Sequence, residues 1–315
     1  MGMGNAPLGP LEWSNLFRFQ FTWSALVILA AVNGYVALVH RVNHLERGPW
    51  PRMRVASALG AAVSFLMAFC SVVGIYDMTL FSAHMVQHLL LVMVGSAFLA
   101  ASAPLDLLVT ASTGGFERSL RQILGSPVAG IFGHPLVGFI LYALAIPAFH
   151  LTSLFSLAMK SGFTHSLEAI AFIGIGYLFW RPVVGVEQSR HPLAPGLRMV
   201  YLFLAVPVDT ITGLALVSTT HIGPYAGFAA GSRTWGPTVL ADIHQGGAIM
   251  WIVGDLIMMA ALIPCALVWL NDERRQTAMI DAAIQAGTLD DAPASPWRPA
   301  ARVVFPTAPP LDRDH

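Results

Sequence analysis

Residues 82–102 read SAHMVQHLLLVMVGSAFLAAS and contain no Asp, Glu, Lys or Arg. A helix needs about 20 mainly apolar residues to cross the hydrocarbon core of a bilayer, which is roughly 30 Å thick. The strands of a membrane β-barrel alternate apolar and polar residues, whereas the run after His88 is continuously apolar. This stretch therefore predicts a transmembrane helix in an all-α membrane protein.

The composition of the whole chain also indicates a membrane protein. Of its 315 residues, 56% are hydrophobic and 11% are charged, whereas a soluble domain carries about 25% charged residues. Lys plus Arg equals Asp plus Glu, 17 each, so the net charge is zero. Because the chain offers no basic field, we expect no nucleic-acid partner. The two cysteines form no Cys-x-x-Cys pair, which excludes a disulfide scaffold or a thiolate zinc ribbon.

Seven stretches have the length and apolar character of membrane-spanning helices. They cover residues 21–39, 55–75, 82–102, 133–150, 164–180, 198–217 and 245–269. We therefore predict a seven-helix transmembrane bundle over residues 1–270, embedded in the lipid bilayer. Residues 271–315 are polar and rich in proline, and we predict that they form a mostly disordered tail.

The arginines predict the orientation of the bundle. Most of them fall in the loops after the first, third and fifth stretches and in the tail. The other side of the membrane holds only Arg18, Lys160 and Arg233. Cytoplasmic loops carry the excess of Lys and Arg. We therefore predict an outer N-terminus and a cytoplasmic C-terminus.

Six of the eleven histidines fall at or near the predicted outer ends of the helices. They are His84, His88, His150, His165, His221 and His244. Imidazole is the commonest metal ligand near neutral pH, and side chains from separate spans can converge at one end of a bundle. These histidines therefore predict a metal site at the outer face.

The pair His84 and His88 is the sharpest of these patterns. The two residues are four apart, so their rings lie on one helix face. Met85 adds a thioether, and imidazole together with thioether suits copper, Cu(I) in particular. The alternative is that the histidines form hydrogen bonds between helices and that Met85 fills the core.

Two further polar patterns open the fifth and seventh stretches. His165 and Glu168 are three apart on one face, and Glu168 could orient the imidazole, bind metal directly or form a structural ion pair. Asp242 and His244 precede the seventh stretch, where Asp242 could serve as a ligand or cap the N-terminus of that same stretch. The pair Gly246–Gly247 predicts close approach of a neighbouring helix.

Two acidic residues, Asp209 and Asp255, fall inside predicted spans with no Lys or Arg at their depth. Intramembrane acids handle protons or ions in many membrane proteins. The alternative for each is a protonated carboxyl that forms a hydrogen bond between helices.

Several functional classes follow from these features. Retinal binding is excluded, because a Schiff base needs an intramembrane lysine and the one lysine, Lys160, lies in an outer loop. A bis-histidine haem protein, a copper-ion transporter, a metal-free scaffold and a copper-holding assembly factor stay open. The chain has no hydrolase or P-loop motif, so we expect no enzyme activity.

The segment His84–Leu91, HMVQHLLL, resembles the hallmark of the integral-membrane, CtaG-like cytochrome c oxidase assembly factors. The resemblance continues through Pro104, His150, residues 165–185 and residues 242–251, and covers roughly residues 55–270. It implies a seven-span protein of the bacterial plasma membrane that is required to build the haem–copper oxidase and supplies it with copper. The implied partners are an oxidase subunit or a copper chaperone.

We therefore predict a non-enzymatic assembly factor that holds copper near its outer face. The primary ligands are expected to be His84 and His88. The further candidates are Met85, His150, His165 and His244, with Glu168 and Asp242 as groups that orient the ligands.

Overall fold

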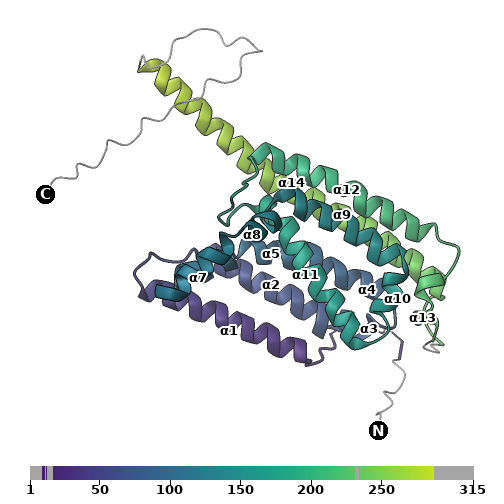
Figure 1. Cartoon of the computed structure of the whole chain (residues 1–315). Coiled ribbons are helices and arrows are strands. Elements are labelled where there is room, and N and C mark those ends of the chain that lie inside the picture. The colour runs from purple at the N-terminus through teal and green to yellow at the C-terminus, as the bar shows by residue number, and fades with distance from the viewer. Residues whose placement is uncertain (1–8, 11, 13–16, 231–233, 287–315) are drawn as a thin grey trace. The chain divides into compact units, whose positions relative to one another are not determined.

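The computed structural model describes residues 9–10, 12, 17–230 and 234–286 (Figure 1). Every regular element in this part of the chain is a helix, as expected for an all-α protein. The chain divides into two compact units, Met1–Trp269 and Leu270–His315. All the helices considered below begin within the first unit.

Six helices or helix series among the described residues are long and apolar enough to cross a membrane. They are α1 (Trp23–His44), α2 with α3 (Arg52–Cys70 and Val72–Tyr76), α4 through α6 (Phe81–Ala111), α11 (Gly162–Val184), α12 (Pro195–Val217) and α14 (Val239–Gln285). The chain is thus a multi-pass helical membrane protein.

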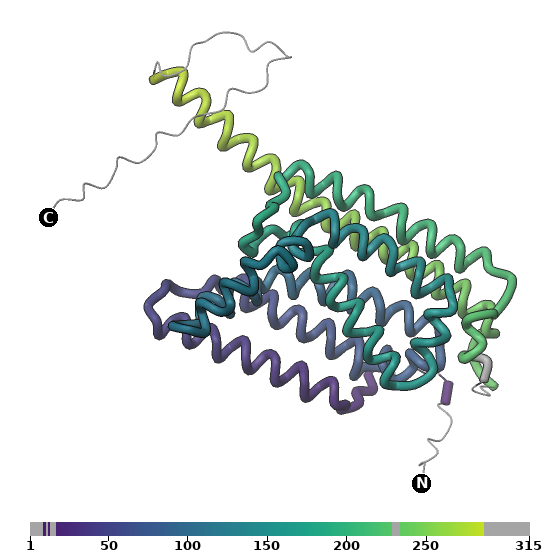
Figure 2. The backbone as a smooth tube through the Cα atoms, in the orientation of Figure 1, coloured from purple at the N-terminus to yellow at the C-terminus, as the bar shows by residue number. Residues whose placement is uncertain are grey.

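The remaining predicted span corresponds to α9, Pro135–Leu151. It has 17 residues, and at 1.5 Å per residue it is about 25 Å long, short of the roughly 30 Å hydrocarbon core. It packs along α11 and α12, as the backbone tube shows (Figure 2). The count of seven spans and the side on which each terminus lies stay predictions.

The third span is a broken helix. It begins as α4 (Phe81–His88), continues as the π-helix η2 (Leu89–Gly95) and returns to α-helix as α5 (Ser96–Ala101). Ala103, with a φ of 51°, then interrupts the helix before α6 (Pro104–Ala111). Single π-helical turns within α-helices occur frequently at functional sites, and this one directly follows the second histidine of the predicted pair.

Side chains of neighbouring helices bind the carbonyl groups of η2. The hydroxyl of Ser64 in α2 donates to the carbonyl of Leu90 at 2.8 Å. Trp180 Nε1 in α11 donates to the carbonyl of Val92 at 2.9 Å. Such bonds satisfy backbone groups that the bilayer cannot solvate. They hold η2, and with it α4, against α2 and α11.

Short helices lie in the connecting segments. At one end of the bundle, α7 (Gly114–Leu124) and α8 (Pro127–Phe132) join the third span to α9, and neither contains a buried residue. The helices α10 (Ser153–Ala158), η3 (Gly223–Tyr225) and α13 (Gly227–Ala230) lie in connections at the opposite end.

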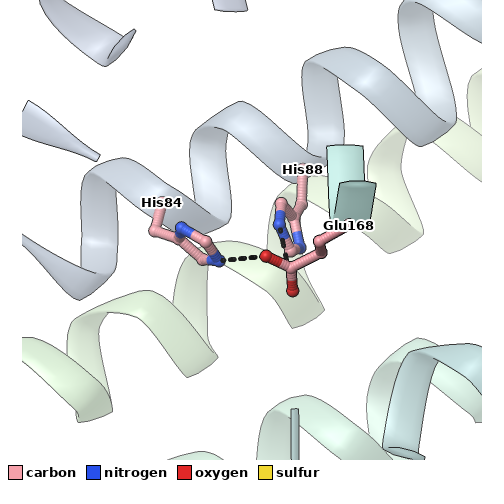
Figure 3. Close-up of side chains that lie close together, drawn as sticks. All are labelled: His84, His88 and Glu168. Carbon is pink, nitrogen blue, oxygen red and sulfur yellow. Dashed lines mark ion pairs between the residues drawn. The ribbon is translucent and has the colours of Figure 1, made fainter. Parts of the chain in front are cut away.

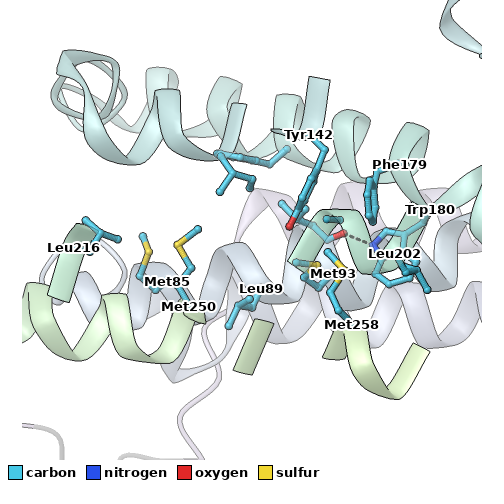
Figure 4. Close-up of a cluster of buried hydrophobic side chains, with 14 of the residues drawn as sticks. Met85, Leu89, Met93, Tyr142, Phe179, Trp180, Leu202, Leu216, Met250 and Met258 are labelled. Atoms are coloured by element: carbon cyan, nitrogen blue, oxygen red, sulfur yellow. Dashed lines mark hydrogen bonds between the residues drawn. The ribbon is translucent and has the colours of Figure 1, made fainter. Parts of the chain in front are cut away.

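The main core joins the third span to α9, α11, α12 and α14 (Figure 4). Tyr142 of α9 stacks on Phe179 of α11, with ring centroids 4.3 Å apart. Large apolar side chains also face outward, among them Phe203 and Ile211 of α12, each 66% exposed. Such a surface suits lipid contact, and close packing rather than exclusion of water then stabilises the interior of the bundle.

Gly246 and Gly247 permit the close helix approach that the sequence predicts. A Cβ on Gly246 would lie 2.4 Å from the ring of Phe81 in α4, and a Cβ on Gly247 would lie 2.7 Å from Cβ of Leu216 in α12. Any larger residue would force α14 away from these two neighbours.

The first part of the predicted tail is helical, and the mostly disordered character of residues 271–315 as a whole stays a prediction. Helix α14 continues through residues 271–285 and ends at Gln285. The physical reason is local, because this segment contains no Gly or Pro and Gln276 donates to Asp272 one turn earlier at 2.9 Å. The proline-rich residues 287–315 lie outside the described part of the chain.

Candidate metal centre

The two predicted primary ligands lie on α4, of which His88 is the last residue, and Asp242 of α14 caps that helix. One carboxylate oxygen of Asp242 accepts from the backbone N–H of Phe81 at 2.8 Å. The other accepts from the backbone N–H and the hydroxyl of Ser82, at 3.2 Å and 2.7 Å. A carboxylate at a helix N-terminus satisfies free N–H groups and complements the helix dipole. Asp242 is therefore a cap on a neighbouring helix, one turn before His84.

His84, His88 and Glu168 come together inside the bundle (Figure 3). Nε2 of His84 and Nε2 of His88 each lie 3.9 Å from a different carboxylate oxygen of Glu168. Two ligands that each lie about 2.1 Å from an ion can be at most about 4.2 Å apart. Both histidine–glutamate distances meet this limit, and one ligand atom from each of the three side chains lies within 4.8 Å of the other two. We call these three side chains the histidine–glutamate centre.

Two of these three side chains lack hydrogen-bond partners among the described residues. Both ring nitrogens of His84 and both carboxylate oxygens of Glu168 are buried and unpartnered. A buried polar group without a partner costs about 1–3 kcal/mol, and more if it is charged. An ion bound by Nε2 of His84 and by the carboxylate would remove this cost for the atoms that bind it, so the residues present fit a bound metal.

His150 holds one of the two imidazoles. Nδ1 of His88 and Nε2 of His150 share a hydrogen bond of 3.0 Å, and Nδ1 of His150 lies 2.7 Å from the carbonyl of Ile146. Metal-bound histidines usually use their second nitrogen in this way, which fixes the ring and its tautomer. In this geometry His150 orients His88 and leaves Nε2 of His88 facing Glu168.

His165 stands at the other side of the centre, with its ring centroid 5.2 Å from that of His84. Its Nε2 bonds to the side-chain oxygen of Gln87 at 3.1 Å, and the amide nitrogen of Gln87 donates to Asp77 at 2.7 Å. Burial raises the pKa of Asp77 to about 6, and the hydrogen bond from Gln87 opposes that rise. These hydrogen bonds connect α11 to the start of the third span and to the segment just before it.

Sequence reasoning did not single out Gln87 at all. In the structure Gln87 is fully buried. The sequence feature that could have marked it is its position three residues after His84. A polar side chain at that spacing shares the helix face of the histidines.

His244 is not one of the side chains of the histidine–glutamate centre, and Met85 stays a predicted ligand. Met85 is buried, and its sulfur lies beside that of Met250 (Figure 4). Both line a cavity of about 20 Å³ next to His88 and His150, which is room for a single water. His244 bonds through Nε2 to the backbone carbonyl of Thr219 at 2.8 Å.

The two intramembrane acids form hydrogen bonds between helices. Asp209 accepts from the hydroxyl of Tyr142 at 2.7 Å, and Asp255 accepts from the hydroxyl of Thr210 at 2.7 Å. This geometry agrees with the structural alternative for both residues. Asp209 also lines the small cavity beside His88.

The helices and this centre define a class of protein: a multi-pass helical membrane protein with a buried cluster of imidazole and carboxylate groups at one end of the bundle. The sequence model of the "Cytochrome c oxidase caa3 assembly factor (Caa3_CtaG)" family matches residues 33–272. The chain belongs to this family, as the resemblance in the His84–Leu91 segment predicts.

Mycobacterial relatives match most of the chain. It is 25% identical over 292 residues to "Uncharacterized protein ML1998" of Mycobacterium leprae, covering 90% of this chain and 44% of the relative. It is 26% identical over 286 residues to "Uncharacterized protein Mb0105" of Mycobacterium bovis, covering 88% of this chain and 42% of the relative. The chain thus spans less than half the length of these relatives. No solved structure matches it significantly.

Proposed function

We propose that this assembly factor binds one copper ion at the histidine–glutamate centre and passes it to a cytochrome c oxidase subunit during assembly. The family supplies the context, since its members are described as assembly factors for this oxidase. Copper is then cargo that the protein carries for a short time, and no catalytic step is needed.

The observation that carries the proposal is the set of unpartnered buried atoms on His84 and Glu168. Polar groups inside a membrane protein normally face a partner. Here each of two imidazoles lies 3.9 Å from an oxygen of the same buried carboxylate. Three donors also leave coordination positions open, and a receiving protein could enter at those positions.

The donor types favour a transition metal over magnesium or calcium. Imidazole binds copper, zinc, iron and nickel, whereas the hard ions prefer oxygen ligands alone. Among the divalent first-row metals, Cu²⁺ binds most tightly to a given set of nitrogen and oxygen donors. The family resemblance implies a haem–copper oxidase as the partner, and we therefore propose copper rather than another metal of this group.

We also propose that the centre lies on the outer side of the membrane and that α9 is a further span, the fourth along the chain, which brings the total to seven. His84 lies near the start of the third span, whereas Arg54 at the start of α2 and Arg181 near the end of α11 mark the opposite end of the bundle. The excess of basic residues marks the cytoplasmic side. In a bacterial plasma membrane the histidine–glutamate centre would then face the compartment in which the copper is delivered.

The geometry speaks against a haem clamped by the histidine pair. His84 and His88 stand on one face of one helix with ring centroids 4.2 Å apart. They therefore cannot bind opposite faces of a single haem iron. An absorption spectrum of the purified protein tests this directly, because a haem protein would show a Soret band.

The test of the proposal is the copper content of the detergent-purified protein. The His84→Ala/His88→Ala variant is expected to lose the ion that the wild type retains. The matched control is His134→Ala/His191→Ala, which removes another contacting pair of rings, with centroids 4.8 Å apart. Equal copper in the wild type and in the first variant would refute the assignment, as would a wild type that holds none.

A further inference from the structure

A large cavity lies at the end of the bundle opposite to the histidine–glutamate centre. Its volume is about 620 Å³, within the range of sites that bind small organic ligands. Four arginines from four elements line it: Arg54 of α2, Arg121 of α7, Arg181 of α11 and Arg190 of the loop after α11. We call this cavity the arginine pocket.

Three of the guanidinium groups are held in place by hydrogen bonds to the backbone. Arg54 donates to the carbonyl of Val186 at 2.9 Å, Arg181 donates to the carbonyl of Gln188 at 2.8 Å, and Arg190 donates to the carbonyl of Gly125. A guanidinium carries five N–H donors, so each keeps others for a ligand. The pocket is therefore built before any ligand arrives.

Carboxylates do not balance this charge. Asp106 is the one acid among the residues that line the pocket, and it lies 3.9 Å from Arg54. Glu187 pairs with Arg181 at 2.8 Å, and Glu117 pairs with Arg121 at 2.9 Å. The four arginines of the pocket thus have three acidic partners among the described residues. The side chain of Arg121 is 59% exposed, and Arg190 is exposed as well, so positive charge stays open to an anion.

Apolar residues form the other part of the lining. Leu105, Val109, Leu124, Phe132 and Leu178 face the same cavity. The neighbouring helices α7 and α8 expose further large apolar side chains, and Phe116, Ile123 and Val128 are each 63% exposed. Short amphipathic helices of this kind lie at a membrane surface with their apolar face among the acyl chains.

We propose that the arginine pocket binds the phosphate headgroup of an anionic phospholipid, with the acyl chains along the exposed apolar residues of α7 and α8. Arginine binds phosphate oxygens through paired N–H groups. Basic pockets between transmembrane helices on the cytoplasmic side recognise anionic headgroups. The inference does not depend on copper, because the pocket and the histidine–glutamate centre share no residue.

The test compares lipids retained by the full chain after purification. Protein reconstituted in nanodiscs of phosphatidylcholine with phosphatidylglycerol is released into neutral detergent, and bound lipid is counted by native mass spectrometry. The wild type is expected to retain phosphatidylglycerol in preference to phosphatidylcholine. The Arg121→Gln/Arg190→Gln variant should weaken this retention about fivefold for each arginine removed.

The matched control is Arg52→Gln/Arg118→Gln. It removes the same charge from two exposed arginines that do not line the pocket, and it should retain the lipid like the wild type. Equal retention by the pocket variant and the wild type would overturn the proposal, and so would a wild type with no headgroup preference. Displacement of the lipid by millimolar inorganic phosphate would assign a soluble anion instead and would also overturn it.

Discussion

The carboxylate of Asp242 accepts a hydrogen bond from the backbone N–H of Phe81 at 2.8 Å, across 161 positions of sequence. This bond ties the start of α14 to the first turn of the helix that carries both histidines. The histidine–glutamate centre is therefore positioned by a residue that is not one of its three members.

Replacing Asp242 by alanine should destabilise the protein and weaken copper binding together. The backbone N–H groups of Phe81 and Ser82 would lose their acceptor, at a cost of about 1–2 kcal/mol in unfolding free energy. Asp242→Asn should restore only part of the stability, because asparagine keeps one acceptor oxygen but places an NH2 donor where the other carboxylate oxygen accepted a hydrogen bond. Thermal unfolding in detergent measures the effect, and equal losses in both variants would contradict the capping role.

Glu168→Gln should have opposite effects on stability and on copper binding. Without metal, the change removes a buried carboxylate that has no hydrogen-bond partner, and we expect the variant to be at least as stable as the wild type. With copper, the loss of a charged donor should weaken binding by tenfold or more, on the order of 1.4 kcal/mol. Unfolding midpoints with and without copper check both effects. A variant that loses stability without metal and keeps its copper affinity would contradict this account.

His150→Ala should weaken copper binding about 10- to 100-fold, the usual effect of losing the partner of a metal-bound histidine. His88 would keep its position but lose the bond that fixes its ring. His244→Ala is the control, because His244 contacts the carbonyl of Thr219 and lies outside the centre. Copper titration of both variants is the measurement, and the prediction fails if His244→Ala is the more damaging change.

Copper binding should weaken as the pH falls. The ligand form of histidine is the neutral imidazole, so protons compete with the ion. Affinity should change little between pH 7 and 8, above the reference pKa of about 6.5. Competition titrations from pH 8 downward test the prediction, and an affinity that rises as the pH falls would argue against imidazole ligands.

The sequence predicted the helical membrane class and the closeness of the His84 and His88 rings, because both depend on local patterns. Apolar runs define the spans, and the spacing of His84 and His88 places their rings on one face. The close approach at Gly246 and Gly247 followed from residue size alone. The resemblance carried by His84–Leu91 identified the family that the comparison shows.

Contacts between distant segments could not be predicted in the same way. The partner of Asp242 is an N–H group on another span, and no local pattern marks it. The π-helix η2 lies within the uniform run LLLVMVG, which looks like an ordinary apolar helix. Its geometry depends on donors from α2 and α11.

Helix geometry explains why His244 and Asp242 face different neighbours. Residues two apart on a helix do not share a face. Asp242 contacts α4, so His244 is directed elsewhere and meets the carbonyl of Thr219, just after α12. The two-residue spacing of Asp242 and His244 therefore already indicated that they contact different neighbours.

X-ray absorption at the copper edge of the loaded, purified protein tests the central claim most directly. The account predicts a first shell of nitrogen and oxygen from two imidazoles and one carboxylate, with the imidazole signal lost in His84→Ala/His88→Ala. A shell dominated by sulfur, or an unchanged spectrum in that variant, would contradict it.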